Sequence, residues 1–554
     1  MKKTRLIAII LSLMMLVTIL SACAPGGDDT PAPPPPANGG QATTDTTADD
    51  GEDAPPPAEG IITMTMYMAD AGFPVDFWGT DMVSQRMIEM TGITFQFELN
   101  ADGTETRQNL IVSSGDYPDL MFMGFAQLAP RTMIQDGLAY SWDNLFERFV
   151  PEAMNTEFMV RNQAILRNLY DFTDEVWTVP SGFVDRRYVD NNTFIMQSPG
   201  YYARGSKLDE LGNPPLVTLD DLEDLLRLAV EHDPDLSDPL FLWNPVGIGW
   251  DANGITILYR SMGGRSVGDG HVINVMPNGN LQHIVRDPLY KETLMFVNRL
   301  YNEGLISHNN FTDGTAEQEA INVSENWVVA VGHYWRSIVP QDLFGDIRPI
   351  PHLAQPGVNY YGPVVGLNGW NGIFVPTANR YQEETAQLLA TMLTDEWQGL
   401  ASGGIYGEHW EWGGPYNTWL IPIGHAADLI NQGFGDWMEG TGAFRYHFAA
   451  FHGLDSALAW GMASTDPFRV EIFTTQNIGQ DASPWEALNP DPETSAGANL
   501  TSIGQLFNSY VAQIVTAPSQ AEAEALFETM MADVEGSGLA QIEAHWNATF
   551  DARN

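Results

Sequence analysis

The chain contains almost no cysteine: Cys23 is the only one in 554 residues. A single cysteine excludes a disulfide within the chain and any metal site built from several thiolates. A lone cysteine is often a small buried hydrophobe. The position of Cys23 directly after an N-terminal apolar segment indicates a different role, and it leaves no thiol nucleophile in the rest of the chain.

Basic residues are scarce as well. There are 25 Lys and Arg against 71 Asp and Glu, a net charge of −46, and lysine occurs only at positions 2, 3, 207 and 291. Nucleic-acid binding depends on a positive patch, so we predict no nucleic-acid partner. The negative electrostatic field of the whole protein also disfavours polyanionic ligands. A solvated acidic surface explains the charge, which does not identify a ligand.

The common catalytic motifs are also missing. The sequence has no H-E-x-x-H, G-x-S-x-G or P-loop pattern. Glu408-His409-Trp410-Glu411 does bring two carboxylates and an imidazole together, and a hydrolase could use such carboxylates as acid and base. Chance explains this cluster in so acidic a chain. We therefore predict that the protein is not an enzyme and uses no cofactor.

The first 22 residues are typical of a secretory signal. Lys2, Lys3 and Arg5 precede the apolar run Leu6–Leu20, which has 15 residues and is short for a membrane span. A retained N-terminal anchor helix is the alternative. We predict a signal peptide over residues 1–22.

Leu20-Ser21-Ala22-Cys23 resembles the lipobox of bacterial lipoproteins. The resemblance implies cleavage before Cys23 and a diacylglyceryl thioether on its sulfur. Residues 24–60 are rich in Pro, Gly, Thr and Asp and have few apolar residues to bury, which predicts a disordered tether. We therefore expect residues 23–60 to anchor a folded body at the extracellular face of the cell membrane.

Hydrophobic patterning in the body predicts an α/β fold. Residues 61–68 and 93–97 read as strands, and 119–123 as a third. Helical spacing over 81–90 and 107–113 separates them, and this alternation is typical of a parallel sheet. A further helix is predicted from residue 219, because Thr218 can cap it and Asp221 completes a capping box. Another is predicted from residue 288, after the cap Asp287. A third is predicted over residues 381–393.

Several of these segments, in this order, resemble the large carbohydrate-associated lipoproteins among the extracellular solute-binding proteins of ABC importers. The matching stretches are 91–98 (TGITFQFE), 113–122 (SSGDYPDLMF), 218–235 (TLDDLEDLLRLAVEHDPD), 301–309 (YNEGLISHN), 372–398 (GIFVPTANRYQEETAQLLATMLTDEWQ) and 404–412 (GIYGEHWEW). They are spread over most of residues 61–550.

The resemblance implies a two-lobed periplasmic-binding-protein-like fold of type II, with a hinge between the lobes and a ligand cleft. We expect lobe 1 to comprise residues 61–185 plus about 373–455, and lobe 2 residues 186–372 plus about 456–554. Some relatives carry a calcium loop after the long helix. Here Pro234, Leu236 and Pro239 interrupt the alternating oxygen ligands of such a loop, so we predict no metal.

Tryptophan is abundant, with 16 residues, many of them in predicted loops. An indole can stack on the C–H face of a sugar while polar neighbours bond its hydroxyls, although ordinary core packing is the alternative for each ring. Because ligands meet loops at the carboxyl ends of strands, we predict ligand contacts from a set chosen largely by position: Phe77, Trp78, Phe125, Trp177, Trp250, His333, Trp335, Trp370, Asn371, Glu408 and Trp410.

The function that these observations favour is capture of a carbohydrate, expected to be an oligosaccharide, and its delivery to an ABC transporter permease. The partners would be a small-molecule ligand, that permease and the membrane, and the protein would be a monomer. Two alternatives stay open: a receptor for a peptide or other nutrient on the same fold, and a secreted glycoside hydrolase. Turnover separates the last from the others, because a binding protein leaves its ligand unchanged.

Overall fold

A computed structural model describes residues 60–553 with gaps at 71–72, 101–103, 171, 184, 188–198, 246–253, 269, 271, 308, 313–314, 325, 334–345, 359, 361–363, 366–369, 414–418, 433, 444, 447, 449–479, 482, 486 and 493. Cys23, Trp250 and Trp335 lie outside the described residues. Among the helices that are described, none has the length and apolar character needed to cross a bilayer.

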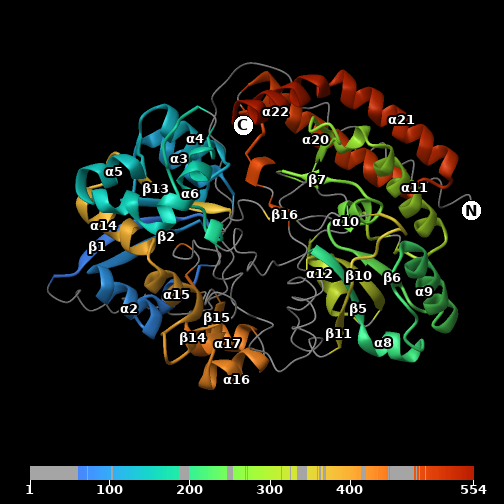
Figure 1. Ribbon diagram of the computed structural model, residues 1–554, viewed down its shortest axis with the longest axis horizontal. Helices are drawn as coiled ribbons and strands as arrows, with labels where there is room; N and C mark the ends of the chain where they lie inside the picture. Colours follow the sequence, from blue (N-terminus) through green and yellow to red (C-terminus); the bar gives the residue numbers. More distant parts are fainter. Residues whose placement is uncertain are drawn as a thin grey trace, which may run out of the picture. The chain divides into compact units, whose positions relative to one another are not determined.

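The first sheet contains five strands in the order β2-β1-β3-β13-β4. Strand β1 (Ile62–Met68) pairs in parallel with β2 (Ile93–Leu99) and β3 (Leu120–Gly124). Strand β13 (Asn371–Pro376) lies beside β3 but runs antiparallel to it, and β4 (Ala139–Tyr140) completes the sheet. Figure 1 shows β13, in orange, next to the blue strands from the start of the chain.

Local signals in the sequence produce the β1–α2–β2 crossover. Asp81 caps helix α2 (Met82–Thr91) by accepting from the Ser84 N–H, and Gly92 ends it in a left-handed conformation with φ 66°. The chain then re-enters the sheet at once, with Ile93 opposite Ile62. Helix α2 therefore starts near the carboxyl edge of the sheet and ends near its amino edge. The other helices whose buried residues join this core are α3 (Thr106–Ser114), α4 (Leu128–Gln135), α5 (Trp142–Phe149), α6 (Glu157–Arg167), α14 (Gln382–Met392) and α15 (Asp395–Gly403).

The second sheet contains four strands in the order β11-β5-β10-β6. Strand β10 (Trp327–His333) is parallel to β6 (Asp238–Leu242) and antiparallel to β5 (Pro199–Arg204), which pairs in turn with β11 (Ile347–Ile350). The core helices are α8 (Gly205–Glu210), α9 (Leu219–His232), α10 (Gly254–Ser261) and α11 (Pro288–Asn302), with α20 (Ser495–Thr516), α21 (Gln520–Gly536) and α22 (Leu539–Arg553), drawn in red in Figure 1. Helix α12 (Thr315–Val323) lies beside β6.

Smaller elements complete the described chain. One small sheet contains β7 (Ser266–Val267), β8 (Ile273–Val275) and β9 (Leu281–His283), and β12 (Val364–Val365) pairs with β16 (Gln480–Asp481). The hairpin β14 (Trp410–Gly413) and β15 (Trp419–Pro422) is followed by α16 (Gly424–Gln432) and α17 (Phe434–Thr441). The 3-10 helices are η1 (Val75–Phe77), η2 (Pro151–Asn155), η4 (Ile284–Arg286) and η8 (Ser483–Trp485).

Each large sheet has its own hydrophobic core. The first core takes residues between Met64 and Phe183 and then from Ile373 onward, whereas the second takes residues from Tyr201 to Leu353 and from Leu488 to Trp546. The α/β prediction with two lobes is confirmed, and so are the predicted caps Thr218 and Asp287. The parallel strands are as predicted, but the returning strand β13 makes the first sheet mixed.

Candidate functional site

The carboxyl edge of the first sheet brings together segments that are far apart in the sequence. Strand β3 ends there at Gly124, and the antiparallel β13 begins there at Asn371, its partner in the register. The Phe125 N–H donates to the Trp370 carbonyl at 3.1 Å, and the Ser181 N–H donates to the Asn371 carbonyl at 2.7 Å. Three backbone segments therefore meet at one edge: Gly124 with Phe125, Trp370 with Asn371, and the stretch after Trp177.

The aromatic residues at this edge differ in exposure. Trp370 is 46% exposed, whereas Trp177 is 8% exposed and its Nε1–H donates to Thr173 at 3.2 Å. Phe125 is half-buried, and its carbonyl accepts from the Tyr170 hydroxyl at 2.7 Å. Burial raises the pKa of that hydroxyl above its usual range, so it remains a neutral donor. Within this set, Trp370 is the ring with a large face open to solvent.

Two glycines allow polar side chains to approach the backbone at this edge. A Cβ at Gly372 would lie 2.2 Å from Thr178 Oγ1, and one at Gly124 would lie 2.6 Å from Gln127 Cδ. Gln127 Oε1 accepts from the Gly124 N–H at 3.1 Å and from Gln108 Nε2 at 2.6 Å. Both of these bonds use the oxygen, so the Gln127 Nε2 group adds an amide donor near Gly124. Gln127 was not among the residues predicted from the sequence, although a polar residue three positions after a strand end is a usable signal.

Phe77 and Trp78 lie where β1 leads into α2. Phe77 is 43% exposed, and the Arg445 guanidinium carbon lies 4.0 Å from the centre of its ring. Trp78 packs against Phe95 and Tyr446 at ring-centre distances of 5.4 and 5.1 Å, and its Nε1–H donates to Thr94. Packing within the lobe therefore accounts for Trp78, while Phe77 lines a groove of about 570 Å³ together with Arg445. Ligand contact by either ring stays a prediction.

The carboxyl edge of the second sheet is built differently. Leu242 at the end of β6 exchanges two hydrogen bonds with the Asn310 amide, at 3.0 and 2.9 Å. Trp243 is 4% exposed, and a Cβ at Gly332 would lie 2.6 Å from Trp243 Cβ. Asn244 follows with φ 44°, is partly exposed, and donates its N–H to Gln318 Oε1. Asn244 is a second candidate that was not predicted from the sequence.

Some of the remaining predicted ligand contacts lie within the described residues and others lie outside them. The backbone of His333 pairs with Pro199 at the end of β10, while Trp250 and Trp335 lie outside the described residues. Glu408 is exposed in the turn before β14. Trp410 is only 2% exposed and donates its Nε1–H to the Gly404 carbonyl at 2.8 Å, so it serves mainly as packing.

The alternative of acid–base catalysis by the Glu408–Glu411 cluster gains no support from its geometry. His409 is 7% exposed, and its Nδ1 accepts the Ile405 backbone N–H at 3.0 Å. Burial lowers the pKa of His409, although Glu408 opposes this. The imidazole therefore holds the turn at Ile405 through its Nδ1.

Asp233 in the interrupted calcium loop contacts one neighbour within the loop and one lysine outside it. Asp233 Oδ1 accepts from the Asp235 N–H at 3.3 Å, and Asp233 Oδ2 lies 3.5 Å from Lys207 Nζ. The described parts of the chain contain no group of three or more His, Cys, Asp or Glu residues arranged to hold a metal ion. Independence from metal stays a prediction.

Comparisons with known proteins show the fold. No family model matches the sequence, and no curated protein matches it. An HMO binding ABC-transporter associated solute binding protein from Bifidobacterium longum infantis has a TM-score of 0.64 at 14% identity, covering 89% of this chain and 99% of its own. The S. pneumoniae ABC-transporter substrate binding protein FusA in complex with kestose has a TM-score of 0.63 at 16% identity, covering 88% of this chain and 99% of its own. The alginate-binding protein AlgQ2 has a TM-score of 0.62 at 14% identity, covering 89% of this chain and 99% of its own. The chain therefore has the two-lobed α/β fold of extracellular solute-binding proteins.

Proposed function

We propose that this protein captures an oligosaccharide outside the cell and delivers it to an ABC transporter permease. The observation that carries the proposal is the fold, which aligns over nearly the whole length of binding proteins whose descriptions name HMO, kestose and alginate as ligands. The exposed Trp370 ring at the carboxyl edge of the first sheet supports it, since Gln127 and Asn371 supply amide groups at the same edge. A flat apolar ring beside polar groups suits a sugar.

The proposal includes the organisation predicted from the sequence. Residues 1–22 act as the signal, and residues 23–60 carry the lipid on Cys23 and form the tether. Lobe 1 comprises residues 61–185 plus about 373–455, and lobe 2 comprises 186–372 plus about 456–554. The protein acts as a monomer at the extracellular face of the membrane, does not bind nucleic acid, and leaves the sugar chemically unchanged.

A ligand screen tests the proposed function. The purified chain is melted alone and with short neutral oligosaccharides, oligogalacturonates or peptides, because a ligand that binds only the native state raises the melting temperature. We expect a rise with one class of oligosaccharide. A rise with peptides alone would replace the sugar receptor by the peptide receptor.

Membrane fractionation tests the anchor separately. Cys23→Ser removes the only sulfur available for lipid attachment, so we expect the variant to leave the membrane fraction or to remain unprocessed. Retention in salt-washed membranes with normal processing would contradict lipidation at Cys23 but would leave ligand binding untouched.

A further inference from the structure

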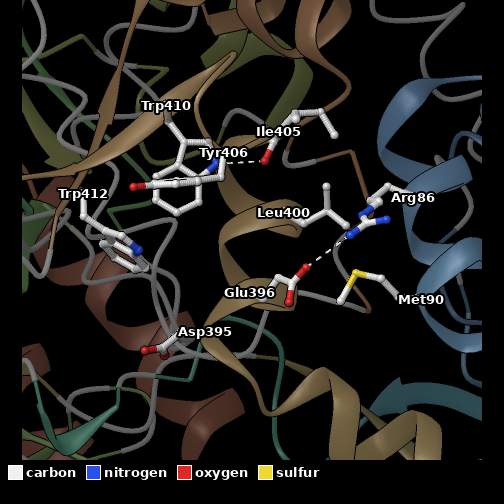
Figure 2. A pocket seen from close by; sticks show the side chains of 10 residues that line it. Arg86, Met90, Asp395, Glu396, Leu400, Ile405, Tyr406, Trp410 and Trp412 are labelled. Carbon is white, nitrogen blue, oxygen red and sulfur yellow. Dashed lines mark hydrogen bonds and ion pairs between the residues drawn. The ribbon is translucent and has the colours of Figure 1, made fainter.

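A pocket of about 400 Å³ lies on the flank of the first lobe, along α2 and α15. Its lining includes Arg86, Asp395, Glu396, Tyr406, Trp410 and Trp412, all of which Figure 2 labels. Helix α2 leaves the carboxyl edge at Asp81 and reaches the amino edge at Gly92, so Arg86 and Met90 lie progressively farther from the carboxyl edge. The lining of this flank pocket shares no residue with the edge that carries Trp370.

Three aromatic rings form one wall of the flank pocket. Tyr406 and Trp412 both meet Trp410 nearly edge to face, at ring-centre distances of 5.1 and 4.9 Å and interplanar angles of 69° and 88°. Trp410 is the buried base, whereas Tyr406 is 63% exposed and Trp412 is half-buried. Two aromatic surfaces at an angle are thus held open to solvent on a fixed support.

Packing against glycines fixes the base of this wall. A Cβ at Gly399 or Gly403 of α15 would lie 2.3 or 2.6 Å from atoms of the Trp410 ring. The indole therefore lies directly on the helix backbone, and its Nε1–H bonds the carbonyl of Gly404 just beyond the helix end. Trp410 thus gives Tyr406 and Trp412 a buried, closely packed support, and such preorganisation lowers the entropic cost of binding.

The side of the flank pocket formed by α2 and the start of α15 is charged, and Arg86 there contacts two carboxylates, since its Nη1 also lies 3.3 Å from Glu89 Oε2. Arg86 Nη2 lies 3.4 Å from Glu396 Oε1, the pair that Figure 2 marks with a dashed line. Asp395 accepts from Arg187 Nη1 and Nη2 at 2.8 and 3.0 Å. Each carboxylate on this side therefore has a guanidinium partner, in a chain whose net charge is −46.

We infer that the flank pocket binds one ring of a neutral sugar, a second carbohydrate site that rests on the proposed function. Both carboxylates are already paired with guanidinium groups, so neither a cation nor an anion finds an unpaired partner charge there. A purely apolar ligand would cover the Arg86–Glu396 pair without satisfying it. A neutral sugar offers C–H faces to Tyr406 and Trp412 and hydroxyls that can both donate to Glu396 and accept from Arg86.

Fluorine NMR of the full chain labelled with 5-fluorotryptophan tests the inference. Trp412→Phe and Trp370→Phe identify the two resonances, and the probe is a mixture of short neutral fructo-, gluco- and galacto-oligosaccharides. We expect the mixture to shift the Trp412 resonance in the wild type and in Trp370→Ala, and oligogalacturonates to leave it unmoved. Tyr406→Ala should weaken the Trp412 response about tenfold, whereas Glu411→Gln, on the same strand but outside the pocket, should not.

The outcomes separate this inference from the proposed function. A Trp370 resonance that shifts while Trp412 stays unmoved overturns the flank site and leaves sugar capture standing. A Trp412 response to oligogalacturonates alone overturns the assignment of a neutral ligand. If no sugar moves either resonance, the flank site is overturned, and a peptide response at Trp370 then overturns the proposed function as well.

Discussion

At the carboxyl edge of each of the two large sheets, a glycine leaves room for another side chain. The tryptophan nearby is buried in one lobe and exposed in the other. In the second lobe, Gly332 leaves room for Trp243, which packs over the strand and is 4% exposed. In the first lobe, Gly372 makes room for the small Thr178 side chain, and the neighbouring Trp370 remains 46% exposed. A tryptophan near a strand end can therefore be buried or exposed, and the two lobes also differ in the side chain that occupies the space above the glycine.

The largest effect expected from this comparison is on stability in the second lobe. Trp243→Ala should lower the free energy of unfolding by about 3–5 kcal/mol, because it removes a large buried ring. Binding by the molecules that remain folded should be normal. Urea unfolding, with ligand affinity measured well below the transition, gives both values. A variant that is nearly as stable as the wild type but binds poorly would place Trp243 on the ligand side.

The two glycines should be intolerant of a methyl group. Gly332→Ala and Gly372→Ala should each cost about 1–3 kcal/mol, since the added Cβ overlaps Trp243 or Thr178. Gly504 in α20 is the matched control, because a Cβ there meets nothing within 4 Å. Gly504→Ala should be neutral or stabilise by up to about 1 kcal/mol. Equal effects at all three positions in thermal unfolding would remove the steric explanation.

Trp370→Ala should reverse the pattern of Trp243→Ala. Loss of one stacking face is worth about 1–2 kcal/mol, so affinity for the sugar found by screening should fall about 5- to 30-fold. The melting temperature should be close to that of the wild type, because the ring is exposed. Calorimetric titration of both proteins measures the difference. Early melting with unchanged affinity would make Trp370 a structural residue.

Each lobe also contains an Asp–Arg pair that should respond to acid. Asp119 accepts from Arg380 and Thr65, and Asp346 accepts from Arg204 and the Ser206 N–H. Burial raises the pKa of both carboxyls, but these hydrogen bonds lower it more, and the net pKa is below its usual value in both. Their stabilisation is complete above the unfolded pKa of about 3.9 and is lost as the pH falls toward the folded value.

Asp119→Asn and Asp346→Asn compare the two lobes directly. Each should reduce stability at neutral pH and flatten the acid dependence of urea unfolding below about pH 4. An acid dependence as steep as that of the wild type in both variants would show that other carboxyls control acid unfolding.

Local elements could be predicted from the sequence because their signals are local. The capping box of Thr218 and Asp221 starts α9, and Asp287 with Pro288 starts α11, as predicted. The exposure of the aromatic residues could not be predicted in this way. Trp78 is packed by Tyr446, which is far away in the sequence, and Trp410 is buried by the glycines of α15. Such contacts form only when the lobe assembles.

The same limit applies to the polar residues of the candidate sites. Gln127 and Asn244 follow strands β3 and β6 closely, so a wider search after strand ends would have found them. Arg86 and Glu396 come from different helices and meet only through tertiary packing. No spacing rule links such residues, and the flank pocket could therefore not be predicted from the sequence.

The most direct test of the central claim is to recover the ligand after binding. The purified chain is incubated with the oligosaccharide that most raises its melting temperature, affinity is measured by calorimetry, and the sugar is then analysed by chromatography and mass spectrometry. The account predicts saturable binding and quantitative recovery of the intact sugar. Shortened sugars whose amount grows with incubation time would contradict it and identify the chain as a glycoside hydrolase.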